Sequence, residues 1–286
     1  MKTYQLFLVF FIFIQISFGQ SETENALLYK VIKNEQSAYL YGTIHIACDA
    51  KLSDRIKNAL SKSDELILEL DLDDPTLPMK MMQQMMLPEQ KDASDFLSDK
   101  DYQLLKNYVN NNVKSIPNFA MVKNMKPVML SSTISSSLLS CTNKTGYDQL
   151  LFQFAQQKNI EVSGLETLAE QMKVFDQMPT KKVYQEIVNF IKNKQQKNRK
   201  LIQQMMKYYN QKNLKGLKKL LDNSESVFTD YMDIALDERN KKWIPKIKQY
   251  LADKKAFIAF GAYHLVGEQG IVKLLRNEGY QVKPVN

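Results

Sequence analysis

Residues 38–45 read AYLYGTIH, and residues 256–264 repeat the same frame as AFIAFGAYH. Each stretch is a short apolar run, which is typical of a buried strand. Each run closes on Gly-x-x-His, first at Gly42 to His45 and again at Gly261 to His264. The chain contains only 2 histidines and 9 glycines in 286 residues. We therefore treat the shared frame as a signal, although either histidine alone also fits a hydrogen-bonded core residue.

Two further apolar runs have the character of buried strands, Glu65 to Leu70 and Ile160 to Gly164. The segments between the four runs carry apolar residues at helical spacing. One of them, residues 131–140, is rich in serine but keeps this spacing, and so predicts a buried helix rather than a linker. Strands separated by helices indicate an α/β fold with a mostly parallel central sheet.

Two long stretches, 75–151 and 181–250, hold more helix than simple crossovers require. We expect them to form a large helical lobe around the sheet. Residues 20–286 are enough for a single domain with a substantial core. We therefore predict one α/β domain with two helical insertions.

The N-terminus has the three parts of a secretory signal peptide. Lys2 is followed by an apolar stretch from Leu6 to Phe18, and small residues precede Gln20. We expect cleavage after Gly19, so that residues 1–19 are removed and the product is periplasmic or secreted. An uncleaved N-terminal anchor is the alternative. No later segment is long and apolar enough to span a membrane, so we expect the mature protein to be soluble.

The formal charge is +8, and its distribution is uneven. Residues 181–219 contain twelve Lys or Arg against the single acid Glu186, a balance of +11. This pattern indicates a solvated helical face or a weak contact with an anionic membrane surface. No nucleic-acid partner is expected, because aromatic stacking positions do not alternate with the basic residues.

Cysteine usage leaves two alternatives. Cys48 and Cys141 would form one disulfide in an exported protein. The bridge would restrain the loop that carries His45. Two free buried thiols fit the sequence nearly as well.

The two histidines and a buried acid predict a metal site. His45 and His264 can share an ion only if their strands lie side by side, because adjacent strands are about 4.8 Å apart. Gly42 and Gly261 would permit close approach of the backbone there. Glu69 is the strongest carboxylate candidate, since a charge inside so apolar a run is costly to bury unless it is paired or coordinated. The alternative for Glu69 is a strand-end carboxylate facing solvent.

Two more residues are candidates for catalytic roles. Glu166 follows the third apolar run and fits a second ligand or a general base. It fits equally well as an acid in the first turn of a helix. Arg239, within Glu238-Arg239-Asn240, would hold a carbonyl or carboxylate of a substrate, or form a surface salt bridge.

These residues give the chain a family likeness. It resembles the TraB/GumN family, which is related to the Tiki metalloproteases and the PrgY pheromone-shutdown proteins. The likeness runs from about Ala38 to Val282. The motifs that carry it are both Gly-x-x-His frames, the Glu69 strand, Tyr147-Asp148, Gly164 to Thr167, Glu238 to Asn240 with Trp243, and the closing glycines Gly267, Gly270 and Gly279.

The resemblance implies a fold like the erythromycin-esterase and ChaN-like proteins. It also implies a divalent-metal-dependent peptidase, with Mn, Co or Zn as the cofactor and a peptide or protein as the substrate. His45, His264 and Glu69 are then the metal and catalytic residues, supported by Glu166 and Arg239. The competing hypothesis is a binding protein that sequesters a peptide, haem or metal without turnover.

Overall fold

The computed structural model describes residues 25–34 and 36–285. The expected signal peptide at residues 1–19 lies outside this range. Within it, a central six-stranded sheet has the order β6-β4-β7-β2-β1-β8, and a two-stranded ribbon pairs β3 with β5. The strands are β1 (Leu28–Lys33), β2 (Gln36–Thr43), β3 (Ala47–Cys48), β4 (Glu65–Leu68), β5 (Lys144–Thr145), β6 (Glu161–Gly164), β7 (Ala256–Gly261) and β8 (Gln281–Pro284).

The centre of the sheet is parallel. β6, β4, β7 and β2 all run in one direction, whereas β1 pairs antiparallel with β2 and with β8. These four parallel strands are the four apolar runs seen in the sequence, and the α/β class is confirmed. β2 and β7 are neighbours, with Thr43 opposite Gly261. The two strands that lead to the histidines therefore end side by side.

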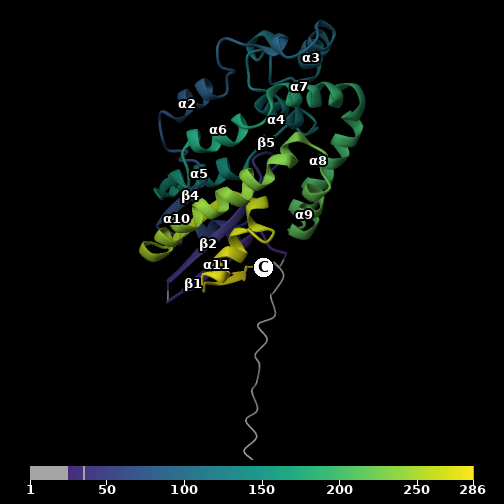
Figure 1. The fold of residues 1–286 in the computed structure, drawn as a ribbon. Coiled ribbons are helices and arrows are strands. Elements are labelled where there is room, and N and C mark those ends of the chain that lie inside the picture. The colour runs from purple at the N-terminus through teal and green to yellow at the C-terminus, as the bar shows by residue number, and fades with distance from the viewer. Residues whose placement is uncertain (1–24, 35, 286) are drawn as a thin grey trace, which may run out of the picture.

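The helices cover the sheet and build a separate lobe (Figure 1). They are α1 (Asp54–Leu60), α2 (Leu77–Gln84), α3 (Asp99–Asn112), α4 (Pro127–Ser137), α5 (Tyr147–Lys158), α6 (Leu168–Asp176), α7 (Thr180–Asn189), α8 (Gln195–Asn210), α9 (Leu214–Asp222), α10 (Arg239–Asp253) and α11 (Ile271–Asn277). The serine-rich stretch is largely α4, as expected.

Two large apolar cores and a small third cluster of Leu77, Leu168 and Met172 hold the described layers together. The larger core lies on the sheet and takes in Trp243 and Ile247 of α10 and Leu151 of α5. The second core belongs to the lobe and joins residues 87–138 to α7, with Leu105, Val109, Phe119, Leu130, Ile134 and Tyr184 among its members. In Figure 1 the α3, α4 and α7 ribbons lie at the end of the molecule away from β1. Both long helical stretches thus contribute to one lobe.

Two turns of π-helix interrupt the α-helices, at Phe190–Lys194 and at Asp233–Glu238. A π-turn holds one residue more than an α-turn and often occurs at functional sites. The second one runs directly into α10, whose first residue is Arg239. Among the helices of the described ranges, we find none with the length and apolar character needed to cross a lipid bilayer.

Candidate functional site

The four candidate acids and histidines lie at the carboxyl ends of the four parallel strands. Glu166 follows β6, Glu69 follows β4, His264 follows β7 and His45 follows β2. This is also their order across the sheet. Such strand ends are where open α/β sheets bind ligands.

His45 is held from one side by Asp148, which lies in the first turn of α5. The Asp148 Oδ2 atom is 2.9 Å from His45 Nδ1, and Oδ1 accepts a 2.8 Å hydrogen bond from the Thr43 hydroxyl. Because Nδ1 is occupied in this way, Nε2 is the ring nitrogen left for chemistry. The His45 side chain is 69% exposed.

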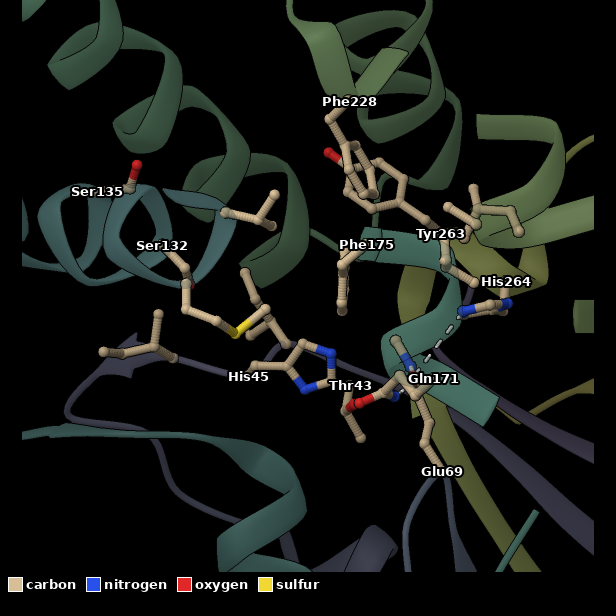
Figure 2. Close-up of a pocket in the computed structure, with 18 of the residues that line it drawn as sticks. Thr43, His45, Glu69, Ser132, Ser135, Gln171, Phe175, Phe228, Tyr263 and His264 are labelled. Carbon is tan, nitrogen blue, oxygen red and sulfur yellow. Dashed lines mark hydrogen bonds and ion pairs between the residues drawn. The ribbon is translucent and has the colours of Figure 1, made fainter. Parts of the chain in front are cut away.

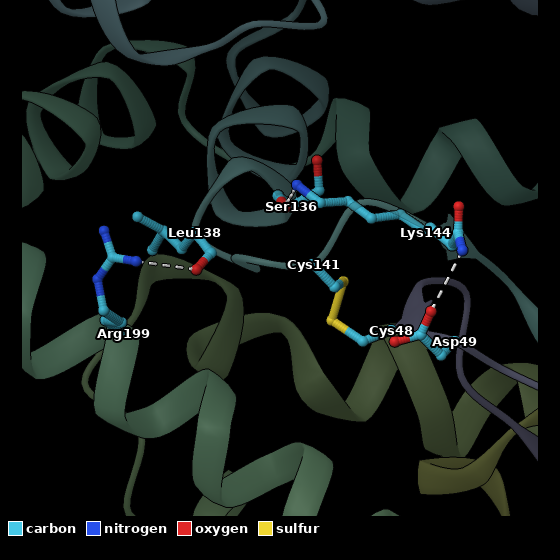
Figure 3. The surroundings of a disulfide bond; sticks show 8 residues. Cys48, Asp49, Ser136, Leu138, Cys141, Lys144 and Arg199 are labelled. Atoms are coloured by element: carbon cyan, nitrogen blue, oxygen red, sulfur yellow. Dashed lines mark hydrogen bonds between the residues drawn. A yellow bond between two sulfur atoms is a disulfide. The ribbon is translucent and has the colours of Figure 1, made fainter.

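Three features restrain the loop that carries His45: a backbone hydrogen bond, a glycine and a disulfide. The Tyr147 N–H donates to the Ile44 carbonyl at 3.1 Å. A Cβ atom at Gly146 would lie 2.3 Å from the His45 carbonyl oxygen, so only glycine fits there. A disulfide joins Cys48 of β3 to Cys141, just before β5 (Figure 3). Segments about 100 residues apart are thereby locked together at the histidine.

His264 has a different environment. It lies in the 3-10 turn Ala262–Leu265 and is 3% exposed. Its Nδ1 is 2.6 Å from Asn240 Oδ1, and the Asn240 amide nitrogen donates to the Gln269 carbonyl at 2.7 Å. The amide oxygen must therefore face the ring, and we infer that Nδ1 carries the proton. The Trp243 ring packs 4.5 Å away between centroids.

Glu69 is buried at 6% exposure rather than facing solvent. Its Oε1 accepts from the Gly261 N–H at 2.7 Å, and its Oε2 accepts from Arg239 Nη2 at 2.7 Å and Gln171 Nε2 at 3.1 Å. His264 Nε2 lies 3.9 Å from Oε1. A carboxylate with this many donors stays ionised.

Arg239 uses all five of its N–H groups within the protein. Nη2 bridges Glu69 and Glu166, and Nε also donates to Glu166. Nη1 donates to the Ala235 carbonyl at 3.0 Å and lies 3.3 Å from His264 Nε2. Ala235 belongs to the π-turn, so the widened turn and the guanidinium contact each other directly. Arg239 therefore holds two carboxylates of its own chain and has no donor left for a substrate.

Glu166 is the second carboxylate that Arg239 contacts. Its oxygens accept from Arg239, from Trp243 Nε1 at 3.2 Å and from Gln171 Nε2 at 3.2 Å. It is not in the first turn of α6, where Glu170 completes a capping box with Thr167. It also does not line the cavity described below. Its place favours support of Arg239 over direct contact with a substrate.

Gly261 marks the point where the candidate residues converge. A Cβ atom built there would lie 3.4 Å from Glu69 Oε1, 3.7 Å from His45 Nε2 and 3.8 Å from His264 Cδ2. A Cβ atom here would make ordinary van der Waals contact with all three, and a longer side chain would enter the space between them. Gly42 has a stricter requirement, because a Cβ there would lie 2.5 Å from the Leu265 side chain and 3.0 Å from the Ala262 backbone.

The convergence point opens into a cavity of about 720 Å³ (Figure 2). This volume is within the range of about 300–1,000 Å³ typical of ligand sites. His45, Glu69, Asp148, Arg239 and His264 line its floor. Helices α4, α6 and α8 and the segment around Phe228 supply much of the rest. The exposed face of His45 thus opens into a protein-walled space.

Local charges move the pKa values of the site in opposite directions. Burial lowers the pKa of His264 to about 3 despite the nearby Glu69. Partial desolvation at the cavity floor also disfavours a charged His45, but the hydrogen bond and charge of Asp148, with Glu69, outweigh it and raise the pKa of His45 to about 9. Burial opposes ionisation of Glu69 as well, yet Arg239 and the other neighbours lower its pKa to about 2. Burial raises the pKa of Glu166.

Comparison with known proteins identifies the family. A family model described as "TraB/PrgY/gumN family" matches residues 27–284, nearly all of the described chain. The chain belongs to the TraB/PrgY/gumN family. The resemblance seen in the sequence is thereby confirmed.

Among curated proteins, this TraB/PrgY/gumN chain is similar to a "Metalloprotease TIKI homolog" of Nematostella vectensis, at 22% identity over 314 residues. The match covers 89% of the chain and 66% of that protein, so the chain spans a little under two thirds of its relative's length. No solved structure matches the chain.

The site of this TraB/PrgY/gumN protein meets only part of what a divalent metal requires. The donor types fit, because two imidazoles with Nδ1 held by oxygen acceptors and one carboxylate face a common point. The arrangement is less favourable. Across the described ranges, no group of three or more His, Cys, Asp or Glu side chains is placed to hold an ion. Arg239 also contacts both Glu69 and His264 Nε2.

Three residues of the site had no role assigned from the sequence. Asp148 and Asn240 orient the two histidines, and Gln171 bridges the two glutamates. Asp148 and Asn240 stand in motifs that carry the family likeness, which was the available signal. Gln171 has no such signal, because it reaches the site from one face of α6.

Proposed function

We propose that this protein is an exported, divalent-metal-dependent hydrolase that cleaves peptides. The observation that carries the proposal is the convergence of His45, His264 and Glu69 on the Gly261 position at the floor of a ligand-sized cavity. The distant similarity to a Tiki metalloprotease homolog supports the reaction class. The signal-peptide pattern in the sequence of residues 1–19 supports export.

His45, His264 and Glu69 would hold the metal. When bound, a divalent ion polarises a carbonyl oxygen and lowers the pKa of a bound water. The chain supplies the rest. Asp148 and Asn240 hold the two rings by Nδ1. Nε2 of His45 is left to face the site, whereas Nε2 of His264 lies 3.3 Å from Arg239 Nη1, which would have to move for a metal to bind there.

The acid–base roles follow from the electrostatics. Glu69 remains a carboxylate because Arg239 and the Gly261 N–H hold its pKa low. Glu166 lies outside the cavity wall and positions Arg239. The solvent-accessible group on the floor is His45, whose Nε2 lies beside the Gly261 position and would face the metal. Binding of a metal at Nε2 would require His45 to lose its extra proton first.

A peptide library is the direct test. Purified protein is incubated with the library after chelation and again after addition of Mn²⁺, Co²⁺ or Zn²⁺. We expect cleavage that depends on metal and is abolished in His45→Ala and Glu69→Gln. Asn58→Ala, at an exposed position of α1, serves as the matched control and should cleave normally. Cleavage that is indifferent to both chelation and His45→Ala would overturn the metal mechanism.

A second candidate is a non-catalytic protein that binds a peptide, haem or metal. The observation in its favour is that all N–H donors of Arg239 are engaged. Two of them contact His264 Nε2 and Glu69 Oε2, the atoms that a metal would need. The same library decides between the two. A pure binder retains peptide without any cleavage, whatever metal is added.

We infer from the basic segment 181–219 that the protein acts near an anionic membrane surface. Exposed lysines on α8, among them Lys197, Lys200 and Lys207, would meet an anionic membrane surface. Vesicles with and without anionic lipid test this contact, and binding should fall as salt rises. Binding that is equal for neutral vesicles would remove the proposal.

A further inference from the structure

Helix α4 divides its hydroxyl groups between two uses. Thr133, Ser136 and Ser137 donate to carbonyls of their own helix at 3.0, 2.8 and 2.6 Å. Ser132 and Ser135 instead line the cavity. Within the described part of the chain, neither of their hydroxyls has a hydrogen-bond partner. Two polar groups are thus left available inside the cavity.

A third unpartnered hydroxyl belongs to Tyr263. Its side chain lines the cavity next to Phe228, on the side away from α4 in Figure 2. The phenol makes no hydrogen bond to the rest of the described residues. It is not sealed away either, since no fully buried polar side-chain atom of the described chain lacks a partner. Ser132 and Ser135 are exposed and Tyr263 is half-buried, so a ligand in the cavity can reach all three hydroxyls. An unpartnered hydroxyl on a cavity wall is a candidate recognition group.

The wall between these hydroxyls is apolar. Met129, Val174, Phe175, Phe228 and Leu236 are among the side chains that form it. Methionine and aromatic side chains make an adaptable apolar surface. Such a wall favours ligands with apolar side groups.

The charge of the cavity excludes anionic ligands. No lysine is among its described lining residues, although the chain carries a net charge of +8. Arg239 lines the floor but has all five donors engaged. His45 also lies on the floor, and Asp148 engages its Nδ1. A fatty acid or a phosphate would therefore find each basic side chain of the lining already paired with a carboxylate. A peptide segment offers both backbone polar groups for the hydroxyls and apolar side chains for the wall.

We propose that the cavity binds an extended, uncharged peptide segment with apolar side chains, and that Ser132, Ser135 and Tyr263 recognise its backbone. The segment lies over the floor residues His45 and Glu69, so the inference rests on the proposed function for its reaction. It adds a substrate class and three specificity-determining residues. Each hydroxyl is expected to form a hydrogen bond that the free protein lacks.

Calorimetric titration tests the ligand class. The probes are acetylated and amidated octapeptides whose four central residues are either Leu-Met-Val-Leu or Gln-Asn-Thr-Gln, together with dodecanoate. We expect the apolar octapeptide to bind at least about tenfold more tightly than the polar one, since each buried methylene contributes about fourfold in affinity. Equal affinity for the two octapeptides, or tighter binding of dodecanoate, would overturn the proposal.

Variants test the three hydroxyls. Tyr263→Phe and the pair Ser132→Ala with Ser135→Ala should each weaken binding of the apolar octapeptide about threefold to tenfold. Ser136→Ala is the matched control, because its hydroxyl bonds within α4, and it should bind normally. Unchanged affinity in all of the cavity variants, with folding verified by circular dichroism, contradicts the assignment.

The two proposals fail separately. If the apolar octapeptide binds and is never cleaved under any metal condition, the hydrolase proposal fails and the recognition proposal stands. If peptides are cleaved without regard to their side chains, the recognition proposal fails and the hydrolase stands.

Discussion

The two Gly-x-x-His frames are alike in sequence but end in unlike surroundings. His264 is enclosed by Trp243, Asn240 and Arg239, and its low pKa keeps it neutral. His45 opens into the cavity, pairs with Asp148, and its raised pKa keeps it protonated near neutral pH when no metal competes. One frame forms a closed end of the site and the other an open end.

The difference shows that a repeated motif specifies position and not environment. Each frame delivers an imidazole to the end of its strand, with a glycine that permits close approach. The neighbours then come from elsewhere in the chain, and they decide charge and access. We expect the closed end to govern stability and the open end to govern contact with the substrate.

The largest effect should come from the closed end. Arg239→Met leaves Glu69 and Glu166 buried without their cation. Loss of one partner from a buried ion pair costs about 3–5 kcal/mol. Urea denaturation measures this, with Lys248→Met as control, since the Lys248–Glu278 pair is exposed and should barely matter. Similar stability for both variants would contradict the enclosed character of Arg239.

The disulfide tests the open end. Cys48→Ala with Cys141→Ala removes a link across 93 residues, which we expect to cost about 2–4 kcal/mol. Amide hydrogen exchange should then rise at Ile44 and Ile46, beside His45, while β7 stays protected. A uniform rise across both strands would mean that the two ends are not independent.

The histidines themselves give a direct contrast. His264→Ala removes a buried ring and leaves the Asn240 carbonyl oxygen without its donor, so stability should fall by about 2–3 kcal/mol. His45→Ala removes an exposed ring and should change stability by less than about 1 kcal/mol. Thermal unfolding of both variants measures the difference. A larger loss for His45→Ala would reverse our view of the two ends.

The subtlest expectation concerns pH. With only two histidines, ¹⁵N NMR of metal-free protein resolves each ring. His45 should titrate near pH 9 and His264 should stay neutral down to about pH 3.

The stability effects have opposite signs. The contribution of His45 is fully present below its unfolded pKa of about 6.5 and is lost as pH rises through 9. The native state keeps His264 neutral, so its contribution is lost as pH falls from about 6.5 toward 3. Titration of both rings near 6.5 would refute the proposed environments.

The sequence predicted the parallel centre of the fold because β4 and β7 are buried along almost their whole length and β2 over its second half, so they read as apolar runs. β6 lies at the sheet edge and is half-buried, but its short run was still recognisable. The sequence did not predict β1 and β8. Their residues, such as Lys30, Lys33 and Lys283, alternate apolar with charged because these strands lie toward one edge of the sheet. A short polar strand has no local signal that separates it from a loop.

The candidate site was likewise predictable only in part. His45, His264 and Glu69 could be found because a motif or an apolar run marks them. The partner of each could not be assigned, since Asp148 lies 103 residues from His45 and depends on the packing of α5. The engagement of Arg239 by two carboxylates likewise requires β4, β6 and α10 to be assembled first.

The π-turn at Asp233–Glu238 makes the site sensitive to residue count. Each residue advances an α-helix by about 100°. Deleting one residue from this turn would let it relax to ordinary α-geometry, and the side chain that now reaches Glu69 would rotate away unless α10 shifted as a whole. We therefore expect relatives that lack one residue at this point to have lost the contacts of this arginine with Glu69 and Glu166, or to supply an arginine from another position.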